Sequence, residues 1–231
     1  MDRHAGLNHK EFVMGGLYLG DKLVTPVVVK KEEVAKTKFG ASVDTWIGDV
    51  DENGVLQTPT WTGALNFAGV KEIGNYGLEY AFYYNTGITS VDLSSVTTVG
   101  TYGMHYAFYS CTGITSIDLS SLTSVGTYGM QYAFEDCTGL TSVDLSSLTS
   151  VGNSGMSYMF NGCSKLTTIS FPLLTDVQSN SFGSSTTNGA FYKCTALTEI
   201  HFRADMQATI EAMSQYANKW GATNAVIYFD L

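Results

Sequence analysis

Cysteine is the residue in this chain best suited to metal ligation or redox chemistry. The four cysteines recur at one position of a repeated sequence: Cys111, Cys137, Cys163 and Cys194. Zinc sites use paired ligands a few residues apart, and no such pair occurs here. We therefore expect reduced thiols buried behind a row of phenylalanines. The alternative is a disulfide between neighbouring copies, which requires suitably directed side chains.

Aspartates form a second recurrent row, because Asp92, Asp118 and Asp144 also occupy one position of the repeat. In a structural interpretation, each carboxylate accepts hydrogen bonds from Ser or Thr of its own Asp-Leu-Ser-Ser turn or from backbone amides. In a functional interpretation, the row joins nearby hydroxyls in an acidic strip that binds a basic partner or a cation. The hydroxyl residues of this strip are Thr115, Ser116, Thr141 and Ser142.

Tyrosines form the third row, with three further tyrosines close by in sequence. The row itself is Tyr80, Tyr106, Tyr132 and Tyr158, and the nearby residues are Tyr76, Tyr102 and Tyr128. Tyrosines stacked from copy to copy stabilise a repeat by packing. The alternative is contact with a protein or glycan, for which rigid, amphipathic tyrosine is well suited. The aspartate and tyrosine rows together are the candidate binding surface.

A possible calcium loop begins at Asp49, with Asp51 and Asn53 at the next two ligand positions. Position 12 of such a loop would be Thr60, where a bidentate glutamate is required. A β-hairpin with an Asn-Gly turn at residues 53–54 explains the same residues. We therefore expect no metal site.

Composition narrows the class of partner. The formal net charge is −9, the pI is near 4.7, and Lys and Arg together number 12, so binding to nucleic acid is not expected. No apolar run approaches the roughly 18 residues of a membrane helix, so we expect no membrane insertion. The chain carries no Gly-x-Ser-x-Gly elbow and no glycine-rich loop followed by lysine, so neither an enzyme nor a cofactor is expected. The four histidines are scattered: His4, His9, His105 and His201.

The elements that position these rows follow from a period of 26 residues, seen at Phe82, Phe108, Phe134 and Phe160. A fixed period of this length is typical of a solenoid. Within one copy, alternating apolar residues predict a short strand near residues 116–119. The next apolar residues have the spacing i, i+3, i+4, i+7, which predicts a short helical turn, and they are Met130, Ala133, Phe134 and Cys137.

We therefore predict an α+β repeat solenoid with short strands and short helical turns. A single coil buries too little apolar surface to offset its backbone entropy, so the coils must stack in register. The stacked ladders would be Val91, Ile117, Val143, Ile169 and Ile200, then Leu93, Leu119, Leu145, Phe171 and Phe202, and then Val99, Val125, Val151 and Val177.

The pattern divides the chain into four parts. Residues 61–196 are predicted to form five coils, the last with a five-residue excess at 179–188. Residues 197–231 are a predicted cap, with a helix near 205–220 that begins at the N-cap Asp205 and a strand near 225–229. Residues 14–60 are a predicted small β-rich module with hairpins at residues 20–21 and 53–54. Residues 1–13 are expected to be a disordered leader or tag, and no signal peptide is recognised there.

The repeat Leu-Thr-Ser-Val-Asp-Leu-Ser-Ser-Leu-Thr-Ser-Val-Gly resembles the BspA-type leucine-rich-repeat family over about residues 62–202. The shared features are the Leu/Ile frame, the Val-Gly corner, the Ala-Phe pair and the trailing Cys. The differences are a longer period, Asp-Leu-Ser-Ser in place of Leu-Pro, and Met159 in place of Ala. The resemblance implies a right-handed leucine-rich-repeat coil. It also implies a bacterial or phage-associated binding surface, commonly displayed outside the cell, with no catalytic apparatus.

Two functions are consistent with these features. The first is a non-enzymatic ligand-binding or adhesion protein that presents a repeated surface to a protein or carbohydrate on a host or bacterial surface. The second is a structural or receptor-binding component of a phage or prophage particle. Both predict an extracellular, cell-surface or virion-associated location.

Overall fold

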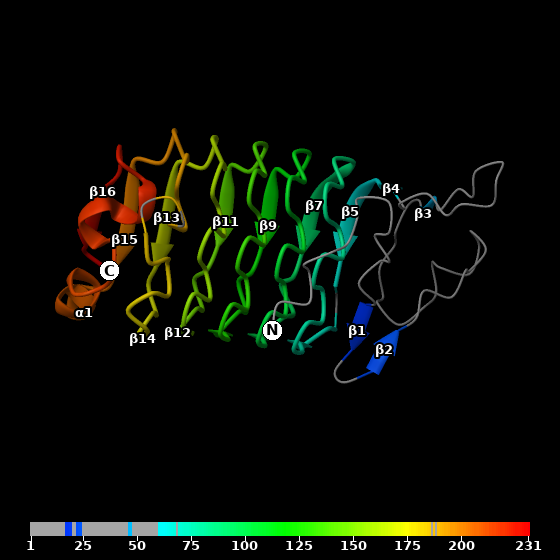
Figure 1. The fold of residues 1–231 in the computed structure, drawn as a ribbon, viewed down its shortest axis with the longest axis horizontal. Coiled ribbons are helices and arrows are strands. Elements are labelled where there is room, and N and C mark those ends of the chain that lie inside the picture. Colours follow the sequence, from blue (N-terminus) through cyan, green and yellow to red (C-terminus); the bar gives the residue numbers. More distant parts are fainter. Residues whose placement is uncertain are drawn as a thin grey trace.

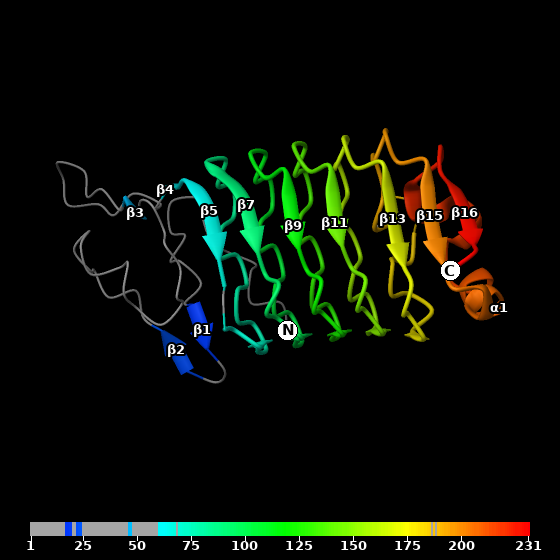
Figure 2. The same cartoon turned by 180° about the vertical axis from the view of Figure 1, so that it is seen from behind.

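The computed structural model describes residues 17–19, 22–24, 46–47, 60–67, 69–185, 187 and 189–231. From residue 63 onward the chain winds into coils that stack along one axis, as Figures 1 and 2 show. Each of the regular coils contributes one strand to each of two parallel arrays. The predicted solenoid is therefore confirmed.

The first array carries the longer strands, which lie side by side in chain order in Figure 1. One four-stranded sheet contains β5 (Gly63–Asn66), β7 (Ile88–Asp92), β9 (Ser116–Asp118) and β11 (Ser142–Asp144). A three-stranded sheet contains β13 (Thr168–Phe171), β15 (Glu199–Phe202) and β16 (Val226–Phe229). Because β15 pairs in parallel with β13, it adds one strand beyond the five predicted coils.

The second array is a five-stranded parallel sheet of two-residue strands. These strands are β6 (Glu72–Ile73), β8 (Thr98–Val99), β10 (Ser124–Val125), β12 (Ser150–Val151) and β14 (Asp176–Val177). Val99 pairs with Val125 and Val125 with Val151, as the predicted ladder requires. Identical positions of the repeat therefore lie opposite one another in both arrays.

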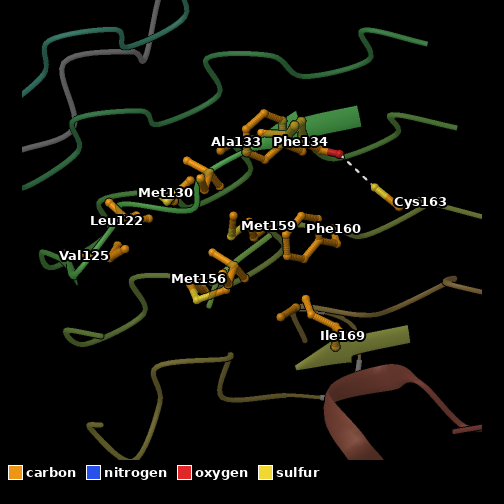
Figure 3. Close-up of a cluster of buried hydrophobic side chains, with 14 of the residues drawn as sticks. Leu122, Val125, Met130, Ala133, Phe134, Met156, Met159, Phe160, Cys163 and Ile169 are labelled. Carbon is orange, nitrogen blue, oxygen red and sulfur yellow. Dashed lines mark hydrogen bonds between the residues drawn. The ribbon is translucent and has the colours of Figure 1, made fainter. Parts of the chain in front are cut away.

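A continuous apolar core fills the space inside the coils. Figure 3 shows Phe134 and Phe160 from consecutive coils, with Met130 and Met156 beside them. The phenylalanine rings stack nearly parallel, at interplanar angles between 5° and 11°. Their centroid separations are 5.0 Å for Phe82–Phe108, 5.4 Å for Phe108–Phe134, 6.1 Å for Phe134–Phe160 and 6.2 Å for Phe160–Phe191. Stacking from coil to coil therefore buries the side chains that a single coil would leave exposed.

The predicted helical turn is wrong, although its apolar residues are buried as expected. Residues 75–84, 101–110, 127–136 and 153–162, which we call the turn segments, are runs of turns with no helix. In the first segment, alternate backbone N–H groups donate within the coil, as from Ala81 to the Leu78 carbonyl at 3.0 Å. The others donate to the next coil, as from Tyr80 to the His105 carbonyl at 2.9 Å. A helix would keep all these bonds within one coil and leave the stack unpaired.

The insertion predicted in the fifth coil lies where expected. The Met156 N–H donates to the Ser181 carbonyl, the usual offset of 25 residues, whereas the Phe160 N–H donates to the Ala190 carbonyl. The chain therefore gains five residues between positions 181 and 190. Ser181 and Phe182 are buried, so the insertion begins inside the core.

In the C-terminal cap, three short helical segments replace the single helix predicted near residues 205–220. These are η2 (Ala204–Met206), α1 (Gln207–Glu211) and η3 (Tyr216–Gly221). The predicted N-cap is wrong, since Asp205 lies inside η2 and pairs with Arg203. The breaks allow Trp220 to be fully buried against Phe182 and Phe202.

At the other end, the backbone shows two antiparallel pairs. β1 (Leu17–Leu19) pairs with β2 (Lys22–Val24) in a register centred between residues 20 and 21, which confirms the first hairpin. β3 (Trp46–Ile47) pairs with β4 (Thr60–Trp61) in a register centred between residues 53 and 54, which agrees with the second hairpin, although its turn lies outside the described residues. The boundaries of the N-terminal module stay a prediction. Among the described residues, no helix is long and apolar enough to span a membrane.

Candidate interaction surface

The strands position the predicted aspartate row on what we call the strand face, the outward side chains of β7, β9 and β11. The backbone register places Asp92, Asp118 and Asp144 opposite one another. Each Oδ1 accepts the backbone N–H of the serine two residues later, and all three distances are 2.9 Å. The aspartates therefore accept hydrogen bonds from the backbone amides of their own turns, as the structural interpretation predicted. Partner or cation binding by this row stays a prediction.

The hydroxyl residues of the strip flank the aspartates, and all four are exposed. The threonine hydroxyls already have acceptors, because Thr115 Oγ1 donates to the Thr89 carbonyl at 3.3 Å and Thr141 Oγ1 to the Thr115 carbonyl at 3.0 Å. Ser116 on β9 lies opposite Ser142 on β11 in the sheet, and each follows its threonine and precedes its aspartate in the chain. Much of the polar capacity of the strand face is therefore used within the solenoid.

The turn segments position the predicted tyrosine row on the opposite part of each coil, and we call their outward side chains the turn face. Tyr80 stacks on Tyr106 at a centroid distance of 4.9 Å, and Tyr132 lies 4.2 Å from both Tyr106 and Tyr158. A second column stacks Tyr76 on Tyr102 at 5.3 Å and Tyr102 on Tyr128 at 4.9 Å. The rings are therefore brought together as predicted.

Sequence inspection missed a third column on the same face. Tyr83 stacks on Tyr109 at 4.8 Å, and Tyr84 contacts Tyr83 edge to face at 4.5 Å. Tyr84 is 59% exposed, and Tyr76 at the end of the second column is 46% exposed. The 26-residue spacing of Tyr83 and Tyr109 was the signal that could have found this column.

The backbone beneath the turn face is in the left-handed region at every fourth residue. Eight tyrosines have φ between 54° and 59°: Tyr76, Tyr80, Tyr84, Tyr102, Tyr106, Tyr128, Tyr132 and Tyr158. Such values are uncommon outside glycine, asparagine and aspartate, because Cβ crowds the backbone. Each non-glycine residue there costs about 1–3 kcal/mol, which the surrounding structure must offset. Backbone hydrogen bonds between coils hold these positions, as from the Tyr106 N–H to the Gln131 carbonyl at 3.1 Å, and ring stacking adds to them where the residue is tyrosine.

The hydroxyls of Tyr106 and Tyr132 stay protonated because their pKa values are raised. Burial is the main factor that raises the pKa of Tyr106 and Tyr132, followed for Tyr106 by repulsion from a neighbouring phenolate and for Tyr132 by its hydrogen bond to Tyr158. Burial and the nearby Glu135 carboxylate raise the pKa of Tyr109 to about 12. The phenols of Tyr106, Tyr109 and Tyr132 are therefore neutral near neutral pH.

The cysteines are reduced and buried, which confirms the first interpretation. Each thiol donates to a phenylalanine carbonyl of the preceding coil, and Figure 3 marks the bond from Cys163 to Phe134. The bonds are Cys111–Phe82 at 3.0 Å, Cys137–Phe108 at 3.2 Å, Cys163–Phe134 at 3.2 Å and Cys194–Phe160 at 2.9 Å. Burial raises the pKa of Cys111 and Cys194 to about 12, so these thiols are unreactive.

Within the part of the chain that the structure describes, no cluster of three or more His, Cys, Asp or Glu side chains could hold a metal ion. The calcium candidates Asp49, Asp51 and Asn53 lie outside the described residues. The histidines within it have carboxylate partners: His105 Nδ1 lies 3.2 Å from Glu79 Oε1, and His201 Nδ1 lies 2.9 Å from Asp230 Oδ1.

Comparison with known families identifies the repeat. The family described as the BspA type leucine-rich repeat region matches residues 78–218 in six copies. No curated protein sequence matches the chain. The match contains strands β7 to β15 and nearly all of the turn segments, whereas β5, β6, β16 and Tyr76 lie outside it. Most of the candidate surface therefore belongs to the repeat itself.

Proposed function

Because this chain belongs to the BspA-type leucine-rich-repeat family, we propose that it is a non-enzymatic interaction module that binds a partner protein through its turn face. Repeat solenoids of this kind serve as extended binding surfaces. In this proposal the module acts in adhesion and is displayed outside the cell. In this proposal, the polar groups of the strand face mainly stabilise the stacked coils, and the partner binds the turn face.

The observation that carries the proposal is the placement of eight tyrosines at positive φ. Strained backbone positions persist where the surrounding structure holds them, and they concentrate at binding sites. Glycine or asparagine would fit these positions with less strain. Tyrosine there instead supplies stacked rings on a backbone that is already ordered.

A protein partner suits the turn face better than the strand face. Tyrosine is enriched at the centres of protein interfaces, where a rigid ring adds contact area with little loss of conformational entropy. Stacking holds Tyr80, Tyr106 and Tyr132 in place before a partner arrives. Preorganisation of this kind lowers the entropic cost of association.

The test uses the two most exposed tyrosines of the turn face, replaced together as Tyr76→Ser and Tyr84→Ser. The matched control is Tyr228→Ser, because Tyr228 is 37% exposed on β16 and lies outside the turn face. The immobilised full chain is exposed to detergent-extracted surface proteins of candidate host cells, untreated, protease-treated or periodate-treated.

We expect capture of specific proteins that protease abolishes and periodate preserves. The double variant should lose that capture by roughly tenfold or more, while the Tyr228 variant keeps it. Capture that resists protease but fails after periodate would identify a glycan partner instead. Capture that is equal for the double variant and the wild type would exclude the turn face.

A further inference from the structure

The turn face has an excess of negative charge. Its four turn segments contain the carboxylates Glu79, Glu135 and Asp136 and neither lysine nor arginine. Glu79 is paired with His105. Glu135 and Asp136 are consecutive, and neither forms an ion pair with the residues that the structure describes. The four turn segments therefore carry an excess of negative charge, which Lys193, two coils further along, reduces.

Glu135 occupies the position of Tyr83 and Tyr109 one coil further along, so its carboxylate replaces a ring in the third tyrosine column. Its carboxylate has a neutral hydrogen-bond partner, because Asn161 Nδ2 donates to Glu135 Oε1 at 2.6 Å. Burial, then repulsion by Asp136, raises the pKa of Glu135 to about 7, and Lys193 lowers it. A second cation beside Glu135 would therefore stabilise the charged carboxylate.

The rings around Glu135 suit a cation as well. Its charge also raises the pKa of Tyr106, Tyr109 and Tyr132, so these three phenols lie within electrostatic range of the carboxylate. Two coils further along, an ammonium lies over a ring, because Lys193 Nζ is 5.4 Å from the centre of Tyr192. An aromatic ring next to a carboxylate binds cations through both its quadrupole and the adjacent charge.

Of the two basic side chains, arginine fits this arrangement better. A guanidinium is planar, so it stacks on a ring while its N–H groups donate to carboxylate oxygens. Tyr84 and Asp136 occupy one position of the repeat two coils apart, a separation of about 10 Å at the usual strand spacing. An extended segment that runs along the stack can therefore contact the exposed ring and the acidic pair together.

We propose that the turn face binds an arginine-bearing segment of a protein, with a guanidinium held by Glu135 and Asp136 beside Tyr109. This inference rests on the proposed function and names the chemistry of its partner. Charge complementarity with the turn face selects this occupant. A neutral glycan would leave both carboxylates without a counterion.

The experiment uses a defined probe, an acetylated and amidated Gly-Arg-Gly-Arg-Gly peptide, with citrulline and lysine analogues. Citrulline keeps the shape of arginine and removes its charge. Binding to the full chain is followed by NMR, through the backbone amide signals of the turn and strand faces. We expect the arginine peptide to shift the signals of Tyr109, Glu135 and Asp136, and the citrulline peptide to bind about tenfold more weakly.

Glu135→Gln and Asp136→Asn should each weaken arginine binding by about tenfold. Asparagine tolerates the left-handed backbone of residue 136, where φ is 57°, so that variant is expected to fold. The matched control is Asp144→Asn, which removes an exposed carboxylate from the strand face. Thermal unfolding of each variant verifies that the comparison is between folded proteins.

The pH dependence adds a signature that a purely structural role would not produce. Because a bound cation favours the charged form of Glu135, arginine affinity should rise between pH 6 and pH 8, with a midpoint near the pKa of about 7. The pKa values of Tyr106, Tyr109 and Tyr132 are raised, so these phenols stay protonated in that range. Asp136 and Lys193 are the other ionisable groups that act on Glu135. Glu135→Gln should flatten the profile.

Equal binding of the arginine and citrulline peptides would overturn the inference, as would shifts confined to the strand face. Unchanged affinity in both Glu135→Gln and Asp136→Asn would do the same. Such results leave the proposed function intact if the Tyr76 and Tyr84 variants still lose protein capture. Conversely, arginine binding with unaltered protein capture would count against the proposed function alone.

Discussion

The strand face and the turn face repeat with the same period but use their polar groups differently. On the strand face, the Asp118 carboxylate accepts the Ser120 N–H and the Thr141 hydroxyl donates to the Thr115 carbonyl. On the turn face, the rings of Tyr76 and Tyr84 are exposed, and the carboxylates of Glu135 and Asp136 are half-buried and form no ion pair with a described residue. A repeated surface is therefore not uniformly available for binding.

The backbone explains the difference. Strand residues have ordinary extended conformations, in which any residue that fits the ladder is accepted. Turn residues alternate between hydrogen bonds within one coil and bonds to the next, which places every fourth residue in the left-handed region. Tyrosines at those positions are costly for stability, so they are the better indicators of function.

The largest expected effect is a loss of stability when valine replaces a residue of the turn face, compared with valine placed on the strand face. Tyr132→Val should reduce the free energy of unfolding by roughly 2–4 kcal/mol, because it removes two stacked neighbours and puts a β-branched residue at φ 59°. Ser116→Val on β9 should change it by less than about 0.5 kcal/mol, because strands accept β-branched residues. Urea unfolding followed by circular dichroism measures both. Similar losses would contradict the contrast between the faces.

The next effect concerns pH. Because the folded state raises the pKa of Glu135 to about 7, the folded protein binds more protons than the unfolded chain below that pH, so stability falls as pH rises from the ordinary glutamate value to about 7. Glu135→Gln should raise the free energy of unfolding at pH 8 by on the order of 1–2 kcal/mol after allowance for solvent screening. It should also reduce the slope between pH 5 and pH 7. Parallel profiles for variant and wild type would refute this assignment.

A smaller effect should reverse sign between the faces. At Tyr132, glycine should be tolerated better than alanine by about 1 kcal/mol, because glycine adopts positive φ freely. At Ser116, alanine should be better than glycine by about 0.5–1 kcal/mol, because glycine loses more backbone entropy in a strand. The four variants are compared by urea unfolding. The same order at both positions would show that the turn backbone is unstrained.

The smallest effect tests the aspartate row. Asp118→Ala should lower the free energy of unfolding by about 0.5–1.5 kcal/mol, since the Ser120 N–H loses its acceptor. Asp118→Asn keeps an acceptor oxygen and should cost less than about 0.5 kcal/mol. Thermal unfolding separates the two. A larger loss for asparagine than for alanine would mean that the charge itself matters on the strand face.

The ladders of Val91, Ile117 and Val143 and the stack of phenylalanines were predictable, because a strict 26-residue period leaves one way to align copies. The helical turn was not, because apolar spacings of three and four residues fit both a helix and a run of four-residue turns. The Glu135 environment was also missed, since its significance depends on Asn161 in the next coil.

The sequence alone determined the period, the residues that face inward and the rows that repeat along the stack, because burial of apolar side chains depends on spacing. Tertiary structure decided the backbone conformation of the turn segments and which polar groups stay available. The physical reason is that the hydrogen-bond partners of one coil lie in the next, 26 residues away, so no local pattern specifies them.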